Sequence, residues 1–211
     1  MTVTSFFADP TDGWVRSRDP VWAICRAGGG MTMEAAPDHQ MVVGGFIGGG
    51  PHFAQMQSFC SFDTSSLSGQ TVSAVLMELC CDDDSSDVVD YDIEVRPWNF
   101  GAAVTIDDWV PGATLAGLTL CGTLTTLGIS TVAYNSVVEN GANFANSINT
   151  TGTTHYSLAS SRLSGDIEVA GQEIVDIAGT DSAGTTRDPK ITVTHSVTVA
   201  GTGDATGLVS A

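Results

Sequence analysis

The fold class is decided by the stretch Asp90-Tyr91-Asp92-Ile93-Glu94-Val95-Arg96-Pro97, in which polar and apolar side chains alternate. Successive side chains of a β-strand point to opposite faces, so this pattern predicts a strand with one buried face and one wet face. The segments from Lys190 to Val199 and from Ala54 to Phe62 alternate in the same way. From Val72 to Cys81 both faces are largely apolar, which predicts a central strand covered on both sides.

Turn-forming residues separate these runs, and 24 glycines with many Thr, Val and Ser residues favour strands over helices. One short helical turn is expected from Ile106 to Val110. Many short strands at fairly regular spacing are typical of an all-β sandwich or barrel.

The chain is expected to form one domain with flexible ends. Residues 1–10 are predicted to be an N-terminal arm, residues 11–195 the β-sandwich, and residues 196–211 a flexible C-terminal tail. Residues 27–50 contain eight glycines. They predict either a long loop or an arm that becomes ordered against a partner.

The chain carries 24 acidic and 7 basic residues, and its net charge of −17 excludes several classes of partner. Nucleic-acid binding needs clustered Lys and Arg side chains, and anionic membrane surfaces attract the same residues. No apolar run approaches the roughly 20 residues that span a bilayer. No secretory signal is expected either, because charged residues interrupt the first thirty positions.

The residues that could carry catalysis or bind a transition metal show no recognisable spacing. The five cysteines lack a C-x-x-C pair and predict small buried hydrophobic residues. His195 lies on the apolar face of its predicted strand and is expected to be a core histidine. Since no G-x-S-x-G motif or local Cys and His signature is present, the chain is predicted not to be an enzyme.

An acidic run that includes Asp82, Asp84 and Asp87 is a candidate calcium site, because hard cations gather carboxylate oxygens at turns. Its spacing does not match an EF-hand loop. The alternative is a solvated turn between two strands.

Three aromatic residues are candidates for stacking on a sugar ring: Trp98, Trp109 and Tyr156. Trp109 follows two aspartates and Trp98 stands between Pro97 and Asn99, so these two are expected to be the more exposed. The alternative is that such large rings fill the core of a sandwich.

Read in order, several segments form a pattern that covers most of the chain: Thr11-Asp12-Gly13-Trp14-Val15, Trp22-Ala23-Ile24-Cys25-Arg26-Ala27, Ser58 to Leu67, Val72 to Leu79, Tyr91 to Trp98, Asp108-Trp109-Val110, His155-Tyr156-Ser157-Leu158, and Asp188 to Thr194. This pattern resembles the DNRLRE domain, a carbohydrate-binding-module-like β-sandwich with relatives among the virion proteins of tailed phages. The resemblance implies a jelly-roll sandwich of two antiparallel sheets. The chain departs from the family at Cys60, at Cys80-Cys81 and in the glycine-rich residues 27–50.

The resemblance, together with the missing export signal, predicts a non-enzymatic virion structural protein of a tailed phage, most of all a capsid decoration (cement) protein. Assembled in the host cytoplasm, it would lie on the outer capsid surface. Its partners would be the major capsid protein and further copies of itself, in a homotrimer. The alternative is a glycan-binding adhesion module of a tail or fibre, and an accessory domain of a secreted polysaccharide-degrading enzyme ranks last.

Overall fold

The computed structural model describes residues 1–30, 32–36, 40–48, 50, 52–86, 89–180 and 186–197, and gives the backbone alone for residues 32–36 and 40. The described strands are β1 (Thr2–Phe7), β2 (Gly13–Asp19), β3 (Thr32–Ala36), β4 (Gln40–Ile47), β5 (Phe53–Asp63), β6 (Gln70–Asp84), β7 (Asp92–Pro97), β8 (Gly122–Thr125), β9 (Ala133–Ser136), β10 (Val138–Glu139), β11 (Thr153–Ser160), β12 (Glu173–Ala178) and β13 (Lys190–Val197). Between them lie short helices: α1 (Trp22–Ala27), η1 (Ser65–Leu67), η2 (Ile106–Asp108), α2 (Gly112–Gly117), α3 (Asn143–Ser147) and α4 (Ser161–Gly165). The protein is mostly β, as the sequence predicts.

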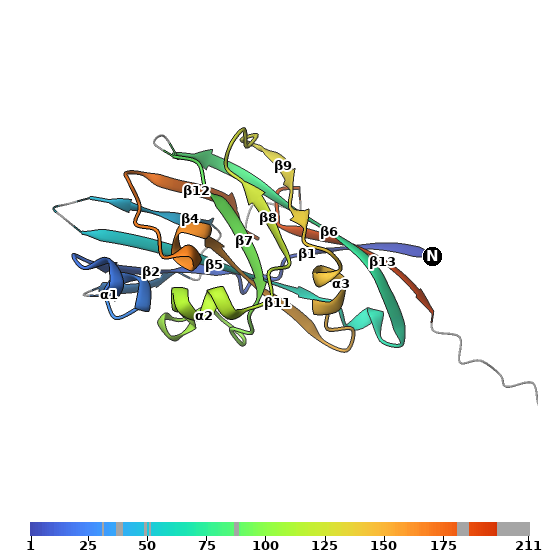
Figure 1. The fold of residues 1–211 in the computed structure, drawn as a ribbon. Coiled ribbons are helices and arrows are strands. Elements are labelled where there is room, and N and C mark those ends of the chain that lie inside the picture. Colours follow the sequence, from blue (N-terminus) through green and yellow to red (C-terminus); the bar gives the residue numbers. More distant parts are fainter. Residues whose placement is uncertain are drawn as a thin grey trace, which may run out of the picture.

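The strands form one large, curled antiparallel sheet (Figure 1). Its hydrogen-bonded order is β1-β13-β6-β12-β4-β5-β11-β7-β8-β10, with β2 and β3 attached at β5 and β9 at β6. The described part of the chain contains no helix that is long and apolar enough to cross a membrane.

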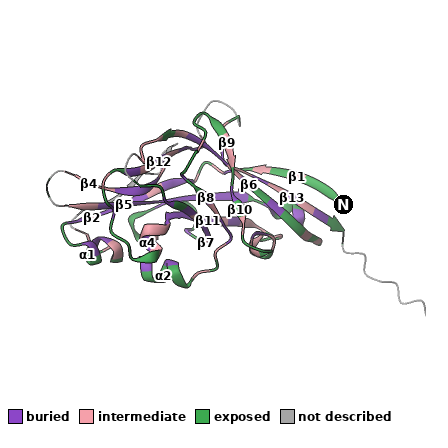
Figure 2. Ribbon diagram, turned by 45° about the horizontal axis from the view of Figure 1, so that its top comes forward, coloured by how far each residue is buried: buried purple, intermediate pink, exposed green. Residues whose placement is uncertain are grey.

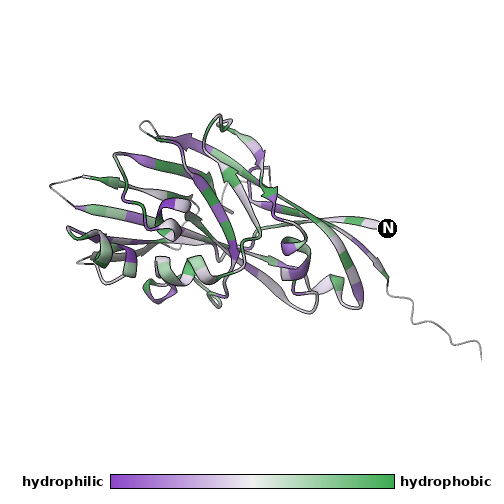
Figure 3. Ribbon diagram, viewed as in Figure 1, coloured by the Kyte–Doolittle hydropathy of each residue, from purple (hydrophilic) through white to green (hydrophobic). Residues whose placement is uncertain are grey.

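The curled sheet encloses the main hydrophobic core. Strands β6 and β13 contribute Met77 and Val193 to this core. Strands β5, β7 and β11 contribute Phe62, Ile93 and Leu158, and none of these five side chains has exposed surface. A second core lies on the other face of β5 and β11, where α2 and α4 cover Phe59 and Ala159. Colours for hydrophobic and hydrophilic residues accordingly alternate along many strands in Figure 3.

The strands predicted from alternating residues are confirmed as β7, β13 and β5, and His195 is buried as expected. The prediction for β6 is only half right. Its inward side chains, among them Val75 and Met77, are buried in the main core, whereas Leu76 on the other face is 43% exposed. Both faces are apolar, but only one is covered along most of the strand.

Two segments predicted to be loops or arms belong to the sheet. Within the predicted N-terminal arm, Thr2–Phe7 forms β1, which pairs with β13 along its whole length. The glycine-rich residues 27–50 include β3, which pairs with β2, and β4, which pairs with β5 and β12. Of the predicted tail, residues 196 and 197 end β13, and residues 198–211 lie outside the described part.

Glycine is required at one point of β4. Gly44 has a φ of +121°, and a Cβ atom there would stand 1.9 Å from the carbonyl oxygen of Glu173 on β12. The hydroxyl of Tyr91, which donates a 2.7 Å hydrogen bond to the carbonyl of Val43, closes the same space from the core side. Two glycines that suggest a loop in the sequence, Gly44 and Gly45, therefore allow close packing inside a sheet.

Candidate functional site

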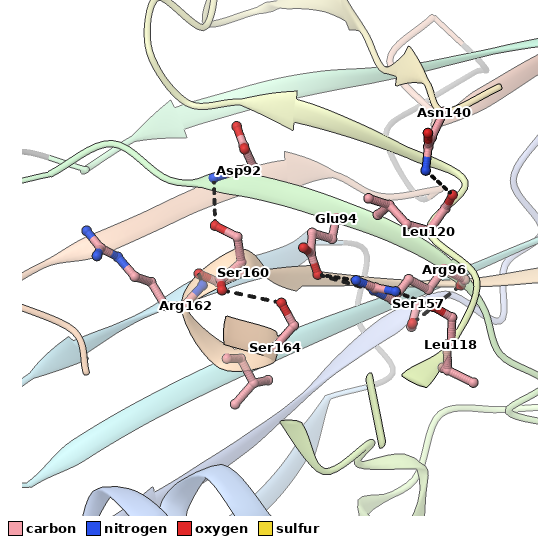
Figure 4. A network of polar contacts seen from close by, with 12 residues as sticks. Asp92, Glu94, Arg96, Leu118, Leu120, Asn140, Ser157, Ser160, Arg162 and Ser164 are labelled. Carbon is pink, nitrogen blue, oxygen red and sulfur yellow. Dashed lines mark hydrogen bonds and ion pairs between the residues drawn. The ribbon is translucent and has the colours of Figure 1, made fainter. Parts of the chain in front are cut away.

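A buried polar network fixes the end of β7 and the chain that follows it (Figure 4). The guanidinium of Arg96 donates from Nε and Nη2 to Oε2 of Glu94, at 3.2 and 3.0 Å, and from Nη1 to the carbonyl of Leu118. Ser157 on β11 donates to the carbonyl of Arg96 at 3.4 Å. These bonds tie β7 to β11 and to the end of α2, so the position of the next residues, Pro97 and Trp98, is well defined.

Trp98 stands directly after this network, in a hollow of about 310 Å³. Its backbone N–H donates to the carbonyl of His155, at 3.3 Å, which continues the pairing of β7 with β11. The hollow is lined by Pro97, Trp98, Asn99, Ser147, Asn149, Thr153, Thr154 and His155. One partly exposed aromatic ring thus lies among amide and hydroxyl groups, a composition that suits a neutral hydroxylated ligand.

A second hollow, of about 490 Å³, shares Thr153 and His155 with the first. Its other lining residues are Asp9, Pro10, Thr11, Ser61, Gly101 and Ala102. We refer to the two hollows together as the Trp98 cleft. His155 lines both hollows, and its ring meets the Phe100 ring edge-on at a centroid distance of 4.9 Å.

Partial burial governs the charges in the Trp98 cleft. It lowers the pKa of His155, while the charge of Asp9 acts weakly in the opposite direction. The pKa of Asp9 is raised, first by burial and then by the charge of Asp63. Within the described part of the chain, Nδ1 of His155 and Nε1 of Trp98 are buried without a hydrogen-bond partner. Burial therefore favours the neutral form of the His155 ring.

The structure corrects two of the three sugar-stacking candidates. Tyr156 has no exposed surface; its hydroxyl bonds to Ser147 at 2.7 Å and its ring packs against Phe144 and Phe62, so it belongs to the main core. Burial also raises its pKa. Trp109 is 7% exposed and lies in the second core. Both rings therefore fill a core, whereas Trp98, which packs against the second core, is only half-buried and lines a hollow.

The acidic run ends β6 and carries only part of the predicted calcium site. Asp82 forms an ion pair with Arg187, and Asp84 accepts a 3.0 Å hydrogen bond from the backbone N–H of Ser86. Asp87 lies outside the described residues. No group of three or more potential metal ligands gathers among the residues that the structure describes, so calcium binding here stays a prediction.

Sequence reasoning missed a groove of about 340 Å³ that crosses β2, β5, β4, β12 and β6. It is lined by Trp14, Arg16, Val42, Phe46, Met56, Asp83, Ser85, Gln172, Ile174 and Asp176. A local signal was present in β2, where Trp14 and Arg16 alternate with buried Val15. Nothing local, however, links residues near position 14 to those near positions 83 and 176.

No protein-family model matches the chain, and the search of curated proteins finds no match either.

Proposed function

We propose that the chain is a non-enzymatic virion structural protein of a tailed phage, most specifically a capsid decoration protein on the outer capsid surface. The mostly antiparallel β-fold is compatible with the jelly-roll sandwich that the sequence resemblance implies, and we propose that finer architecture with it. The major capsid protein and further copies of the chain, in a homotrimer, are the proposed partners. Assembly would take place in the host cytoplasm.

The observation that carries this proposal is an exposed, uncharged face on β1, β13 and β6 of a strongly acidic molecule. Direct strand pairing places Val3 beside Thr194 and Ala74, and Ser5 beside Thr192 and Leu76. We call these six residues the neutral face. Val3 is 62% exposed and Leu76 43%, and Figure 2 shows that most of β1 is exposed. Exposed apolar side chains gathered on one face are typical of protein–protein contacts.

The distribution of charge favours attachment through that face. All seven basic side chains make contacts within the molecule, so the surplus of acidic groups remains unneutralised. Their partners are the Trp14 ring for Arg16, the Gly48 carbonyl for Arg18, Leu163 and Asp166 for Arg26, Glu94 for Arg96, Glu173 for Arg162, Asp82 for Arg187 and Glu78 for Lys190. At other parts of the surface, the exposed carboxylates of two copies of this chain would repel each other.

Capsid binding tests the proposal. Purified protein is mixed with capsids that lack it, and both co-sedimentation and resistance to heat are measured. We expect binding and a gain in heat resistance for the native chain, and loss of both for Val3→Asp or Leu76→Asp. Ile24→Asp is the matched control, because Ile24 is 42% exposed on α1, which lies at the opposite end of the molecule from β1 (Figure 1). Capsids that neither bind the protein nor gain resistance would contradict the proposal.

Trp98 supports the second candidate function, glycan binding by a tail or fibre module. This half-buried ring lines a hollow, with Asn99, Asn149 and Thr153 as polar neighbours. Trp98→Ala should abolish signals on a glycan array, while Ile106→Ala, which also removes an exposed apolar side chain, should leave them unchanged. A broad array that gives no signal with folded native protein would eliminate this candidate.

A further inference from the structure

The groove across β2, β5, β4, β12 and β6 combines an apolar floor with an acidic wall. Met56, only 3% exposed, forms the floor together with the half-buried Val42 and Ile174. Asp83 and Asp176 lie at the β6 and β12 side. At the β2 side the guanidinium of Arg16 lies over the Trp14 ring, 5.9 Å from its centroid.

The two carboxylates of the acidic wall face each other. Asp176 pairs directly with Asp83 in the register of β12 and β6, which puts both side chains on the same face of the sheet. Like charges in directly opposite positions destabilise a sheet. Accordingly the pKa of Asp176 is raised, first by partial burial and then by the charge of Asp83. Asp83 also accepts a 2.7 Å hydrogen bond from Ser85, which holds its carboxylate in place.

Among the described residues, no ion pair joins either carboxylate to a basic side chain; Arg16 lines the opposite side of the groove, over the Trp14 ring, and the other bases have their partners outside it. A ligand cation would therefore relieve a repulsion that the free protein retains. The cation cannot come readily from a second copy. The chain's one lysine, Lys190, has its Nζ 3.0 Å from Glu78 and 4.2 Å from the centre of the Tyr134 ring.

We propose that this groove binds a lysine side chain of the partner protein on which the chain is mounted. The methylene stem would lie on Met56, Val42 and Ile174, and the ammonium group would lie between Asp83 and Asp176. A compact ammonium with three donors suits two carboxylates on different strands, whereas the planar guanidinium of arginine suits a single carboxylate better. This inference rests on the proposed attachment to another protein and names the chemistry of one contact.

The first experiment measures the contact with a defined probe. The ¹⁵N-labelled protein is titrated with the peptide acetyl-Gly-Lys-Gly-amide and, separately, with its norleucine counterpart, which has the same stem length without the charge. We expect the lysine peptide to shift backbone amide resonances of β6 and β12, with a dissociation constant on the order of millimolar for a single side chain. The norleucine peptide should shift none of them.

Substitutions complete this experiment. Asp83→Asn with Asp176→Asn should weaken binding of the lysine peptide at least about tenfold, which is the loss of roughly one good charged contact. Asp92→Asn, which removes an exposed carboxylate on β7, is the matched control and should leave binding unchanged. Because the double variant removes a repulsion, its thermal stability should equal or exceed that of the native chain. Equal binding of both peptides, or undiminished binding by the double variant, would overturn the inference.

A second measurement separates this inference from the proposed function. In the capsid co-sedimentation assay, the Asp83→Asn, Asp176→Asn variant should bind at least about tenfold more weakly than the native chain. If it binds as tightly as the native chain, the lysine contact is refuted and capsid attachment stands. If the native chain itself does not bind capsids, the proposed function fails, and the peptide titration still decides whether the groove accepts lysine.

Discussion

At the scale of single residues, two ion pairs of the protein lie largely out of solvent, Arg96–Glu94 and Arg162–Glu173. Glu173 shows this most clearly, because it has no exposed surface and stands on β12 in the interior. Its Oε2 accepts a 3.0 Å hydrogen bond from Nε of Arg162, and its Oε1 accepts one from the backbone N–H of Ala170, also at 3.0 Å. Both oxygens are therefore satisfied, and the ion pair fixes α4 to the sheet.

Glu173→Gln tests how much that pair contributes. The substitution removes the negative charge and leaves the guanidinium of Arg162 partly buried without its counter-ion. We expect the free energy of unfolding to fall by about 2–4 kcal/mol, because breaking a buried pair from one side costs more than the pair contributes. Denaturant titration at neutral pH measures the change. Glu78→Gln, which opens the more exposed pair with Lys190, should cost less than about 1 kcal/mol, and similar losses for the two variants would contradict this reasoning.

The five cysteines give a second prediction at the residue scale. All five are free and buried. Burial raises the pKa of Cys25 to about 11 and that of Cys81 to about 12, and it raises the pKa of Cys60 well above its ordinary value. The reactive thiolate is therefore scarce at pH 8 as well as inaccessible. A colorimetric thiol assay should detect almost no reaction in the folded protein and all five thiols in denaturant. Rapid reaction of a thiol in the folded state would contradict this.

At the scale of elements, the alternation of apolar and polar residues predicted where strands lie but not how much of each face is covered. It located β7 and β13 because each has one buried face, and period two is then visible. It failed for the outer face of β6, since Leu76 is apolar without being buried. It also failed for β1, whose exposed position at the edge of the sheet leaves only a weak pattern. Edge strands depend on a partner strand distant in sequence, which no local pattern reveals.

Glycine content misled the prediction for residues 27–50, and Gly44→Ala tests the reason. A Cβ atom at this position would stand 1.9 Å from the Glu173 carbonyl oxygen and 2.6 Å from the Tyr91 hydroxyl, at a φ of +121°. Strain and overlap act together, so we expect a loss of about 3 kcal/mol or more in the free energy of unfolding. Gly69→Ala is the control. Its φ of +72° is also unfavourable, but nothing lies within 4 Å, so it should cost about 1–2 kcal/mol. Equal losses would show that space at Gly44 is irrelevant.

At the scale of the whole molecule, the candidate sites depend on contacts between strands far apart in sequence. The Trp98 cleft joins the end of β7 to β11 and to Asp9, and the groove joins β2 to β12 and β6. The sequence offered Trp98 as one aromatic residue among several. Only the packing of Tyr156 and Trp109 in the two cores separated it from the others. Aromatic residues fill the two cores and also line the candidate site, so the sequence alone could not tell which of them are available to a ligand.

The unbalanced charge gives the last prediction. All seven bases are already engaged within the molecule, whereas exposed acids such as Asp92, Asp107 and Glu168 contribute to a net charge of −17. Repulsion among them favours the expanded unfolded chain. Raising sodium chloride from about 10 mM to about 0.1 M shortens the screening length from about 30 to about 10 Å. The midpoint of thermal unfolding, Tm, should therefore rise by about 2–4 °C, which corresponds to a gain of about 1 kcal/mol for a chain of this size.

A variant with amides at those three positions should show a smaller rise, because it carries less repulsion to screen. A Tm that falls with salt would instead mean that internal ion pairs such as Arg162–Glu173 and Arg96–Glu94 outweigh the repulsion, since screening would then remove more attraction than it relieves.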